Sequence, residues 1–399
     1  MERISLVKCP YDSKKKAVQE KVWQAIEMLG GLEDRFVRAK KVLIKANVVP
    51  YNSQKVYKRL LCLTDPTVLG AVAAWIRKVN PGTEITLVDE FFRPWFDMET
   101  GLKRLGYLKP LRRLEVKLVD QPAPGLFESV NGGLMFRRYW LPELLREADA
   151  VVSVAHMKAH VGTGFSLSIK NLFGWPPTSK YAHPRRYLHS QVRLPLVLAD
   201  IGLIVRPALS VVDAMVAVNG DEWVGESMRM NLLLAGSNSA AVDAVGARLM
   251  GLDPEADYPA FPYMFDRNHL LAAARAGLGP VAQGEIEVVG EPLAPNAKRF
   301  HVERKRPAEI VEALRRDIAR QALFFRDNRG RFVDEHRGNL IGLMKDKVLF
   351  SIENVADIPT RSTLSPHSTE NAIFFVRAVP EEEDWENYEV YERVLSQAE

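Results

Sequence analysis

Short apolar, β-branched runs alternate along the first 290 residues with longer stretches in which apolar residues recur at helical spacing. The runs predict strands at residues 41–44, 84–88, 115–119, 150–154, 209–212, 231–234 and 285–289. Helical spacing predicts helices at 16–29, 66–78, 141–147 and 240–250, and Asp65 followed by Pro66 is typical of a capped helix start. This alternation indicates an α/β fold with a mixed, largely parallel sheet and helices on both faces.

The pattern changes after residue 290. Residues 291–307 are rich in proline, charge and small side chains, which predicts a linker. Beyond it, residues 308–325 have the spacing of a charged amphipathic helix, 339–344 and 348–352 predict a hairpin, and 372–376 a third strand. We therefore expect an α/β core over 1–290, the linker over 291–307, a small α+β accessory module over 308–380 and an acidic tail over 381–399.

Composition narrows the class of protein. The 399 residues carry a formal net charge of +4, which suits an anionic small molecule and gives nucleic acid little support as a partner. The two cysteines, Cys9 and Cys62, are far apart and form no CxxC, so one chain can build neither a disulfide framework nor a cysteine-ligated iron–sulfur cluster. The sequence shows no signal-peptide core and no unbroken apolar span, which predicts a cytoplasmic protein without a membrane partner.

Polar residues directly follow four of the predicted strands. In open parallel sheets, ligands bind beyond the carboxyl ends of the strands, so these residues are candidates for one shared site. They are Lys45 and Asn47 after the first strand, Asp89 and Glu90 after the second, His156, Lys158 and His160 after the fourth, and Asp213 after the fifth.

The densest segment runs from His156 to Gly174. If the backbone is extended at Lys158 and His160, their i, i+2 spacing places a cation and an imidazole on one face. Gly162 and Gly164 could present backbone N–H groups to an anion, and a lysine near another cation can act as a base or nucleophile. Alternatively, the lysines, which include Lys170, are solvated and His160 is a structural histidine.

A loop-like stretch at 180–189 adds His183 beside the basic pair Arg185 and Arg186. The pair could clamp an anionic substrate, with His183 as acid, base or metal ligand, or could only make the loop soluble. A divalent metal held by His160, His183 and Asp89 or Asp213 is an optional part of this hypothesis. Phosphate-binding loops, dinucleotide fingerprints, HExxH and nucleophile-elbow motifs are absent from the sequence.

Seven pieces of the chain, between about residues 40 and 280 and in the family's order, resemble the domain of unknown function 362 family. They are Val42-Leu-Ile-Lys45-Ala-Asn47, Thr64-Asp65-Pro66, Lys158-Ala-His160, Lys170-Asn171-Leu-Phe-Gly174, His183, Pro207-Ala-Leu-Ser-Val-Val-Asp213, and Val242-Asp243 with Gly251-Leu-Asp-Pro254. The resemblance implies shared polar residues at Lys45, Asn47, Thr64, Lys158, His160, Lys170, Asn171, His183 and Asp213, without a settled reaction.

The resemblance also bears on cofactors and partners. Many members of the family carry a ferredoxin-type segment with eight cysteines, which this chain lacks, so an iron–sulfur cluster is not expected. Residues 324–376 resemble a small uncharacterised βα module that follows other domains in prokaryotes, which implies an accessory or dimerisation role and leaves a homo-oligomer open.

These observations lead to one leading hypothesis, an enzyme acting on a carboxylate or phosphate compound, with its reaction class open. The expected catalytic residues are Lys158, His160, Lys170 and His183. The expected ligand-binding residues are Lys45, Asn47, Thr64, Gly162, Gly164, Asn171, Arg185, Arg186 and Asp213, and the optional metal ligands are His160, His183 and Asp89. A non-catalytic sensor or carrier of the same kind of ligand is the main alternative, and nucleic-acid binding ranks below both.

Overall fold

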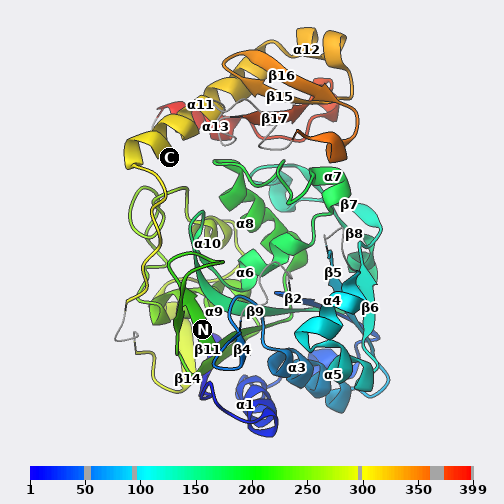
Figure 1. The fold of residues 1–399 in the computed structure, drawn as a ribbon, viewed down its shortest axis with the longest axis vertical. Helices are drawn as coiled ribbons and strands as arrows, with labels where there is room; N and C mark the ends of the chain where they lie inside the picture. Colours follow the sequence, from blue (N-terminus) through cyan, green and yellow to red (C-terminus); the bar gives the residue numbers. More distant parts are fainter. Residues whose placement is uncertain (49–54, 92–96, 295–298, 360–372, 397–399) are drawn as a thin grey trace.

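The computed structural model describes residues 1–48, 55–91, 97–294, 299–359 and 373–396. Its main feature is a ten-stranded sheet with helices on both faces (Figure 1). The strands lie in the order β14 (Ile286–Gly290), β1 (Glu2–Lys8), β13 (Leu232–Gly236), β11 (Leu209–Asn219), β9 (Ala150–His160), β2 (Lys41–Ala46), β5 (Glu84–Asp89) and β6 (Lys117–Asp120). The short strands β10 (Gly164–Ser166) and β12 (Glu226–Met228) pair with β9 and β11. The predicted α/β fold with a mixed, largely parallel sheet is confirmed.

Strand direction sets where a site can form. The neighbours β11, β9, β2, β5 and β6 all run parallel, while β13 is antiparallel to both β1 and β11. The carboxyl ends of four central strands therefore meet at one edge of the sheet. Two strands extend well past their predicted ends, β9 to His160 and β11 to Asn219, so that both carry polar side chains into this edge.

Two apolar layers cover the sheet. One face packs against α1 (Lys15–Glu27), α2 (Glu33–Val37), α3 (Pro66–Val79), α4 (Met98–Leu105) and α5 (Leu108–Arg113). The other face packs against α6 (Ser168–Asn171), α8 (Arg193–Val205), α9 (Ser239–Leu249) and α10 (His269–Arg275). The predicted cap of α3 is present, because the Asp65 carboxylate accepts a hydrogen bond from the Thr67 N–H at 2.7 Å.

Two local predictions differ from the structure. Residues 2–8 form β1, a strand that the sequence patterns do not predict. It lies inside the sheet between β14 and β13, with Ile4 and Leu6 buried toward one layer and Val7 toward the other. The helix predicted at 141–147 is wrong, because Leu141 and Pro142 end β8 (Arg138–Pro142), which pairs with β7 (Pro124–Glu128). Only the 3-10 helix η2 (Glu143–Glu147) follows. A short hairpin joins β3 (Lys55–Val56) to β4 (Arg59–Leu60).

The chain after residue 307 forms a C-terminal unit, which we define as residues 308–396. It holds α11 (Ala308–Asp327), α12 (Arg329–His336), α13 (Glu389–Ser396) and the antiparallel sheet of β16 (Lys347–Ile352), β15 (Leu340–Met344) and β17 (Phe374–Arg377). Ala372, where the third strand was predicted to begin, lies outside the described residues. The C-terminal unit lies over the end of the core that carries α7 (Thr178–Tyr181) and α8 (Figure 1).

The fully buried Arg193 at the start of α8 joins the core to this unit. Its Nε and Nη2 donate to the two carboxylate oxygens of Glu386 at 2.6 and 2.7 Å, and its Nε also donates to the Tyr391 hydroxyl at 3.0 Å. A two-point contact between buried charges fixes orientation as well as distance. No helix in the described part of the chain is long and apolar enough to cross a bilayer.

Candidate functional site

The first strand end holds a buried ion pair. Lys45, near the end of β2, donates from Nζ to Asp89 Oδ2 of β5 and to the Ala46 carbonyl, both at 2.8 Å, and both charged side chains are at most 3% exposed. Burial lowers the pKa of Lys45, and the Asp89 charge opposes that shift. Gly174 makes room for the pair, since a Cβ at this position would lie 2.4 Å from Lys45 Cε.

Strand β9 supplies the next three side chains, because His156, Lys158 and His160 alternate onto one face of an extended strand. Lys158 is buried, and its Nζ donates to the Cys62 carbonyl at 3.2 Å and to Asn47 Oδ1 at 3.3 Å. It also lies 5.2 Å from the centre of the Trp223 ring. Within the described ranges, no carboxylate forms an ion pair with Lys158, and burial lowers its pKa.

His160 is held as a neutral imidazole. Its Nδ1 accepts a hydrogen bond from the Gly162 N–H at 3.1 Å, and its Nε2 lies 3.8 Å from Glu222 Oε1. Burial, with Lys170 and His189 adding to it, lowers the pKa of His160 well below its usual value. The Gly162 amide is thus occupied by a protein acceptor, while Gly164, at φ +77°, pairs with His160 across β9 and β10.

Lys170 has the fewest hydrogen bonds of the site lysines among the described residues. It lies in α6, whose first two N–H groups, from Ser168 and Ile169, donate to the Asp243 carboxylate at 2.8 and 2.9 Å. Lys170 Nζ lies 4.7 Å from the Phe173 ring centre and has no hydrogen bond to any residue that the structure describes. Burial and the nearby Lys158 charge lower the pKa of Lys170 to about 7.

His189 completes this corner of the site. Its ring meets Phe173 edge to face, with 5.6 Å between the ring centres. The surrounding protein atoms and the Lys170 charge lower the pKa of His189 to about 4, so this imidazole is neutral near pH 7. Lys170 therefore lies among neutral rings, and Lys158 is the cation whose charge lowers its pKa most.

Three of the predicted ligand-binding residues tie strands together. Asn171 Nδ2 donates to the Lys45 carbonyl at 2.9 Å and to Ser153 Oγ at 3.0 Å, while its buried Oδ1 has no partner among the described residues. The Thr64 hydroxyl donates to the Val154 carbonyl at 2.8 Å. Asp213 accepts the Asp65 N–H at 2.8 Å and lies 3.7 Å from His156 Nδ1. The Asn171 contact fixes the backbone of Lys45, and the other two join β9 and β11 to the segment before α3.

The basic loop is used by the protein itself. Arg185 donates to Glu90 Oε2 at 3.1 Å, to the Pro176 carbonyl at 2.6 Å and to the Gly174 carbonyl. Arg186 donates to the Pro359 carbonyl at 2.8 Å, in the C-terminal unit, and its guanidinium lies 5.6 Å from the Phe375 ring centre. Neither arginine presents a clamp to an open ligand site in this arrangement, and His183 is exposed at the surface.

Three side chains contact the site without being among its predicted residues: Glu222, Trp223 and Phe173. Glu222 accepts the Val161 N–H at 3.2 Å, close to His160, and its neighbour Trp223 lies over Lys158. Phe173 lies under Lys170. For Glu222 and Trp223, the sequence does give an indication: both lie between Gly220 and Gly225, directly after β11, where a loop at the carboxyl edge of the sheet is expected.

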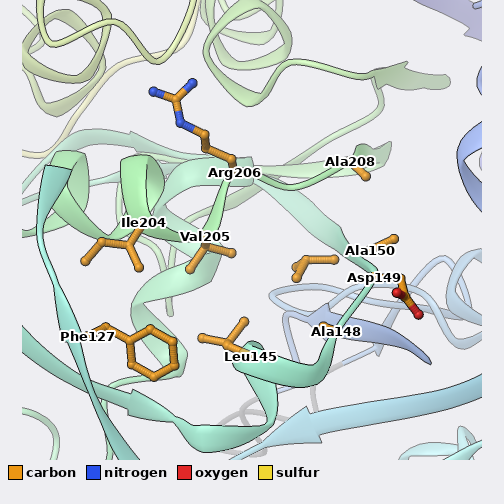
Figure 2. Close-up of a pocket in the computed structure, with 10 residues that line it drawn as sticks. Phe127, Leu145, Ala148, Asp149, Ala150, Ile204, Val205, Arg206 and Ala208 are labelled. Atoms are coloured by element: carbon orange, nitrogen blue, oxygen red, sulfur yellow. The ribbon is translucent and has the colours of Figure 1, made fainter. Parts of the chain in front are cut away.

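The described residues contain no group of three His, Cys, Asp or Glu side chains that could hold a metal ion. His160, His183 and Asp89 are not brought together as a ligand set, and Asp89 is engaged by Lys45. A pocket of about 170 Å³ does exist elsewhere, near the start of β9 and thus at the opposite edge of the sheet (Figure 2). It is lined by Phe127, Leu145, Ile204, Val205 and Arg206, among others, and by none of the predicted site residues.

Comparisons with known proteins cover the region of this site. The model of the family described as "Domain of unknown function (DUF362)" matches residues 42–248, which run from β2 into α9. The thylakoid-associated protein sll1697 of Synechocystis sp. is 26% identical over 264 residues, 64% of this chain and 74% of the relative.

Among solved structures, the lactate racemase apoprotein from Thermoanaerobacterium thermosaccharolyticum matches with a TM-score of 0.40 and 14% identity. That match covers 63% of this chain and 57% of the racemase chain, which is less than two thirds of its length.

Proposed function

The chain belongs to the domain of unknown function 362 family, and from the geometry of its site we propose that it is an enzyme acting on a small anionic molecule. The substrate carries a carboxylate or phosphate group. Lys158 holds this anionic group, and Lys170 exchanges a proton with the substrate. The reaction class is acid–base or nucleophilic chemistry at Lys170.

One observation carries this proposal: two lysines face the site without a carboxylate of their own. Lys45 is neutralised by Asp89 at 2.8 Å, whereas Lys158 and Lys170 form no ion pair with any of the residues described. Glu222 is near enough for its charge to raise the pKa of both lysines, so one carboxylate serves two cations. A ligand carboxylate or phosphate would supply the missing negative charge in a largely desolvated place, where such an interaction is strong.

The acid–base role falls to Lys170 because of its pKa of about 7. A group that titrates near neutral pH can take up and return a proton at comparable rates. His160 has a pKa far below that range and accepts the Gly162 N–H at Nδ1, so its remaining N–H at Nε2 is a hydrogen-bond donor. In the proposal, His160 orients the substrate, and Asn47 aligns the Lys158 ammonium through its 3.3 Å contact.

A sensor or carrier is the second candidate, and the contacts of the site loop favour it. Residues 183–193 hold His189 beside Lys170 and also contact the C-terminal unit, through Arg186 to Pro359 and Arg193 to Glu386. Ligand binding at Lys170 would thus be felt at this interface. We keep a cytoplasmic location as part of the proposal, supported by the two buried cysteines that remain free.

The test is thermal unfolding of the full chain with a panel of carboxylates and phosphates. A ligand that binds only the folded state raises the midpoint with its concentration. We expect at least one anion to do so in the wild type and in Lys109→Met, which removes an exposed lysine of α5, and to fail in Lys158→Met. A midpoint that no anion changes would refute the proposed site. Binding without turnover of any bound compound would favour the carrier.

A further inference from the structure

Three lysines reach the site, and their Nζ atoms have different partners. Lys45 donates to a carboxylate and a carbonyl, both at 2.8 Å. Lys158 donates to a carbonyl at 3.2 Å and an amide oxygen at 3.3 Å. Lys170 Nζ donates to no carboxylate, carbonyl or amide oxygen among the residues the structure describes, and it lies against the face of the Phe173 ring. It is therefore the amine whose protonated form receives the fewest hydrogen-bond acceptors from the described residues.

Lys170 is also the lysine that a substrate can reach. Lys45 and Lys158 are 1% and 4% exposed, whereas Lys170 is only partly buried and its neighbour His189 is exposed. The end of α6 thus opens toward solvent, while Lys158 lies deeper, within the range where its charge acts on Lys170. A small molecule entering here would meet the Lys170 amine first, with the Lys158 ammonium near enough for its charge to act at the same place.

An amine attacks only when it is neutral. The pKa of about 7 leaves a substantial neutral fraction of Lys170 at physiological pH, as is required of lysines that form covalent intermediates in apolar or cationic surroundings. The aromatic face of Phe173 and the neutral rings of His160 and His189 provide such surroundings.

We propose that Lys170 is a nucleophile that forms an imine with the carbonyl carbon of an anionic oxo compound, in the first instance a 2-oxo acid. This inference rests on the proposed function, because Lys158 must hold the substrate carboxylate. In a 2-oxo acid the carbonyl carbon is bonded directly to the carboxylate carbon. One ammonium group and one amine at the same site match that arrangement.

The chemistry balances without a further reactant. The Lys170 nitrogen lone pair forms the C–N bond, the carbonyl π pair moves to oxygen, and a proton passes from nitrogen to that oxygen to give a carbinolamine. A second proton, taken from solvent through Glu222, lets the oxygen leave as water with its bonding pair. The products are a protonated imine and one water molecule.

Reductive trapping tests the step. The full-length protein is incubated with pyruvate or 2-oxoglutarate and sodium borohydride, which transfers hydride to an imine and makes the adduct permanent. Lactate and inorganic phosphate, which are anions that form no imine, are run in parallel with thermal unfolding. The modified lysine is located by peptide mass spectrometry in the wild type, in Lys170→Arg, which keeps the positive charge, and in the surface control Lys109→Arg.

We expect one adduct, with the mass of the oxo acid less one oxygen, on Lys170 in the wild type and in Lys109→Arg. Its yield should exceed that on any other lysine at least tenfold, and Lys170→Arg should show none. Stabilisation by lactate or phosphate without an adduct at Lys170 would overturn the imine and leave the proposed anion site standing. An adduct spread evenly over surface lysines would also overturn it. Neither stabilisation nor adduct would overturn both proposals. An adduct at Lys170 without stabilisation by any anion would support Lys170 as the nucleophile and overturn the role of Lys158 as the group that holds the carboxylate.

Discussion

Replacing Asp89 by asparagine should destabilise the folded protein strongly, because it leaves a buried ammonium group without its counter-ion. Asp89 uses both oxygens: Oδ2 accepts from Lys45 Nζ at 2.8 Å and Oδ1 from the Glu90 N–H at 2.8 Å. Asparagine offers one oxygen for these two donors and places an NH₂ group against the other. The Lys45 side chain is 1% exposed, so water cannot take over the lost contact.

The magnitude can be bounded in two ways. Removing one partner of a buried ion pair typically costs about 3–5 kcal/mol. The alternative for Lys45 is to release its proton. From an ordinary lysine pKa of about 10.4, this costs roughly 4.6 kcal/mol at pH 7, at about 1.36 kcal/mol per pKa unit. Both routes predict that the free energy of unfolding falls by several kcal/mol, and the variant adopts the state of lower free energy.

If Lys45 loses its proton in the variant, the direction in which stability changes with pH can be tested. In the variant, burial without a carboxylate lowers the folded-state pKa of Lys45 below its unfolded value, so the unfolded state binds more protons. The stability of the variant should then rise with pH, and the difference in unfolding free energy between wild type and variant should become smaller between pH 7 and pH 9.5. Urea unfolding followed by circular dichroism measures both midpoints.

Glu84→Gln is the matched control, since Glu84 lies at the other end of β5 and pairs with Lys117 at the surface. Surface ion pairs contribute little to stability, so this variant should change the midpoint much less. A loss for Asp89→Asn no larger than that of the control, or a gap independent of pH, would refute the reasoning.

Three further predictions concern the same framework. Labelling of Lys170 by an amine-reactive anhydride should increase with pH, with a midpoint near pH 7, because burial and the Lys158 charge lower its pKa to about 7. Peptide mass spectrometry yields the midpoint, and a value near the ordinary lysine pKa of about 10.4 contradicts the assignment. Gly174→Ala should lower the urea midpoint by overpacking worth about 1–3 kcal/mol, because its Cβ would lie 2.4 Å from Lys45 Cε; an unchanged midpoint would show that Lys45 can move away. Arg193→Met should lower the free energy of unfolding by about 3–5 kcal/mol, because it leaves the fully buried Glu386 carboxylate without its cation. The variant should also release the C-terminal unit faster during proteolysis. Equal cleavage rates in variant and wild type would show that Arg193 does not hold this unit to the core.

The class of fold and the edge of the sheet that carries the polar cluster follow from local patterns along the chain. The apolar runs at β2, β5, β9 and β11 are buried on both faces, so their hydrophobicity is nearly continuous and reads as interior strands. Strand order along the chain and helices between the strands then imply parallel neighbours. Polar residues that follow such strands must gather at one edge, wherever the helices lie in detail.

The sequence also identified Lys158 and His160 as members of one face, because period-two alternation depends only on the local backbone. It could not identify β1 as an inner strand. That strand is held by β13 and β14, whose sequence positions lie more than 220 residues away. A pattern of seven residues with charged ends is as typical of a segment outside the sheet as of an inner strand.

What each polar residue does depends on contacts that form only in the folded chain. Lys45 and Lys170 both follow apolar segments, yet one pairs with Asp89 and the other has no acceptor among the described residues. Likewise Arg185 and Arg186 are adjacent in sequence, but one binds Glu90 and the other the C-terminal unit. The physical reason is that the protonation and availability of a buried group depend on distances of a few ångströms to partners from other elements. Local sequence patterns carry no information about those distances.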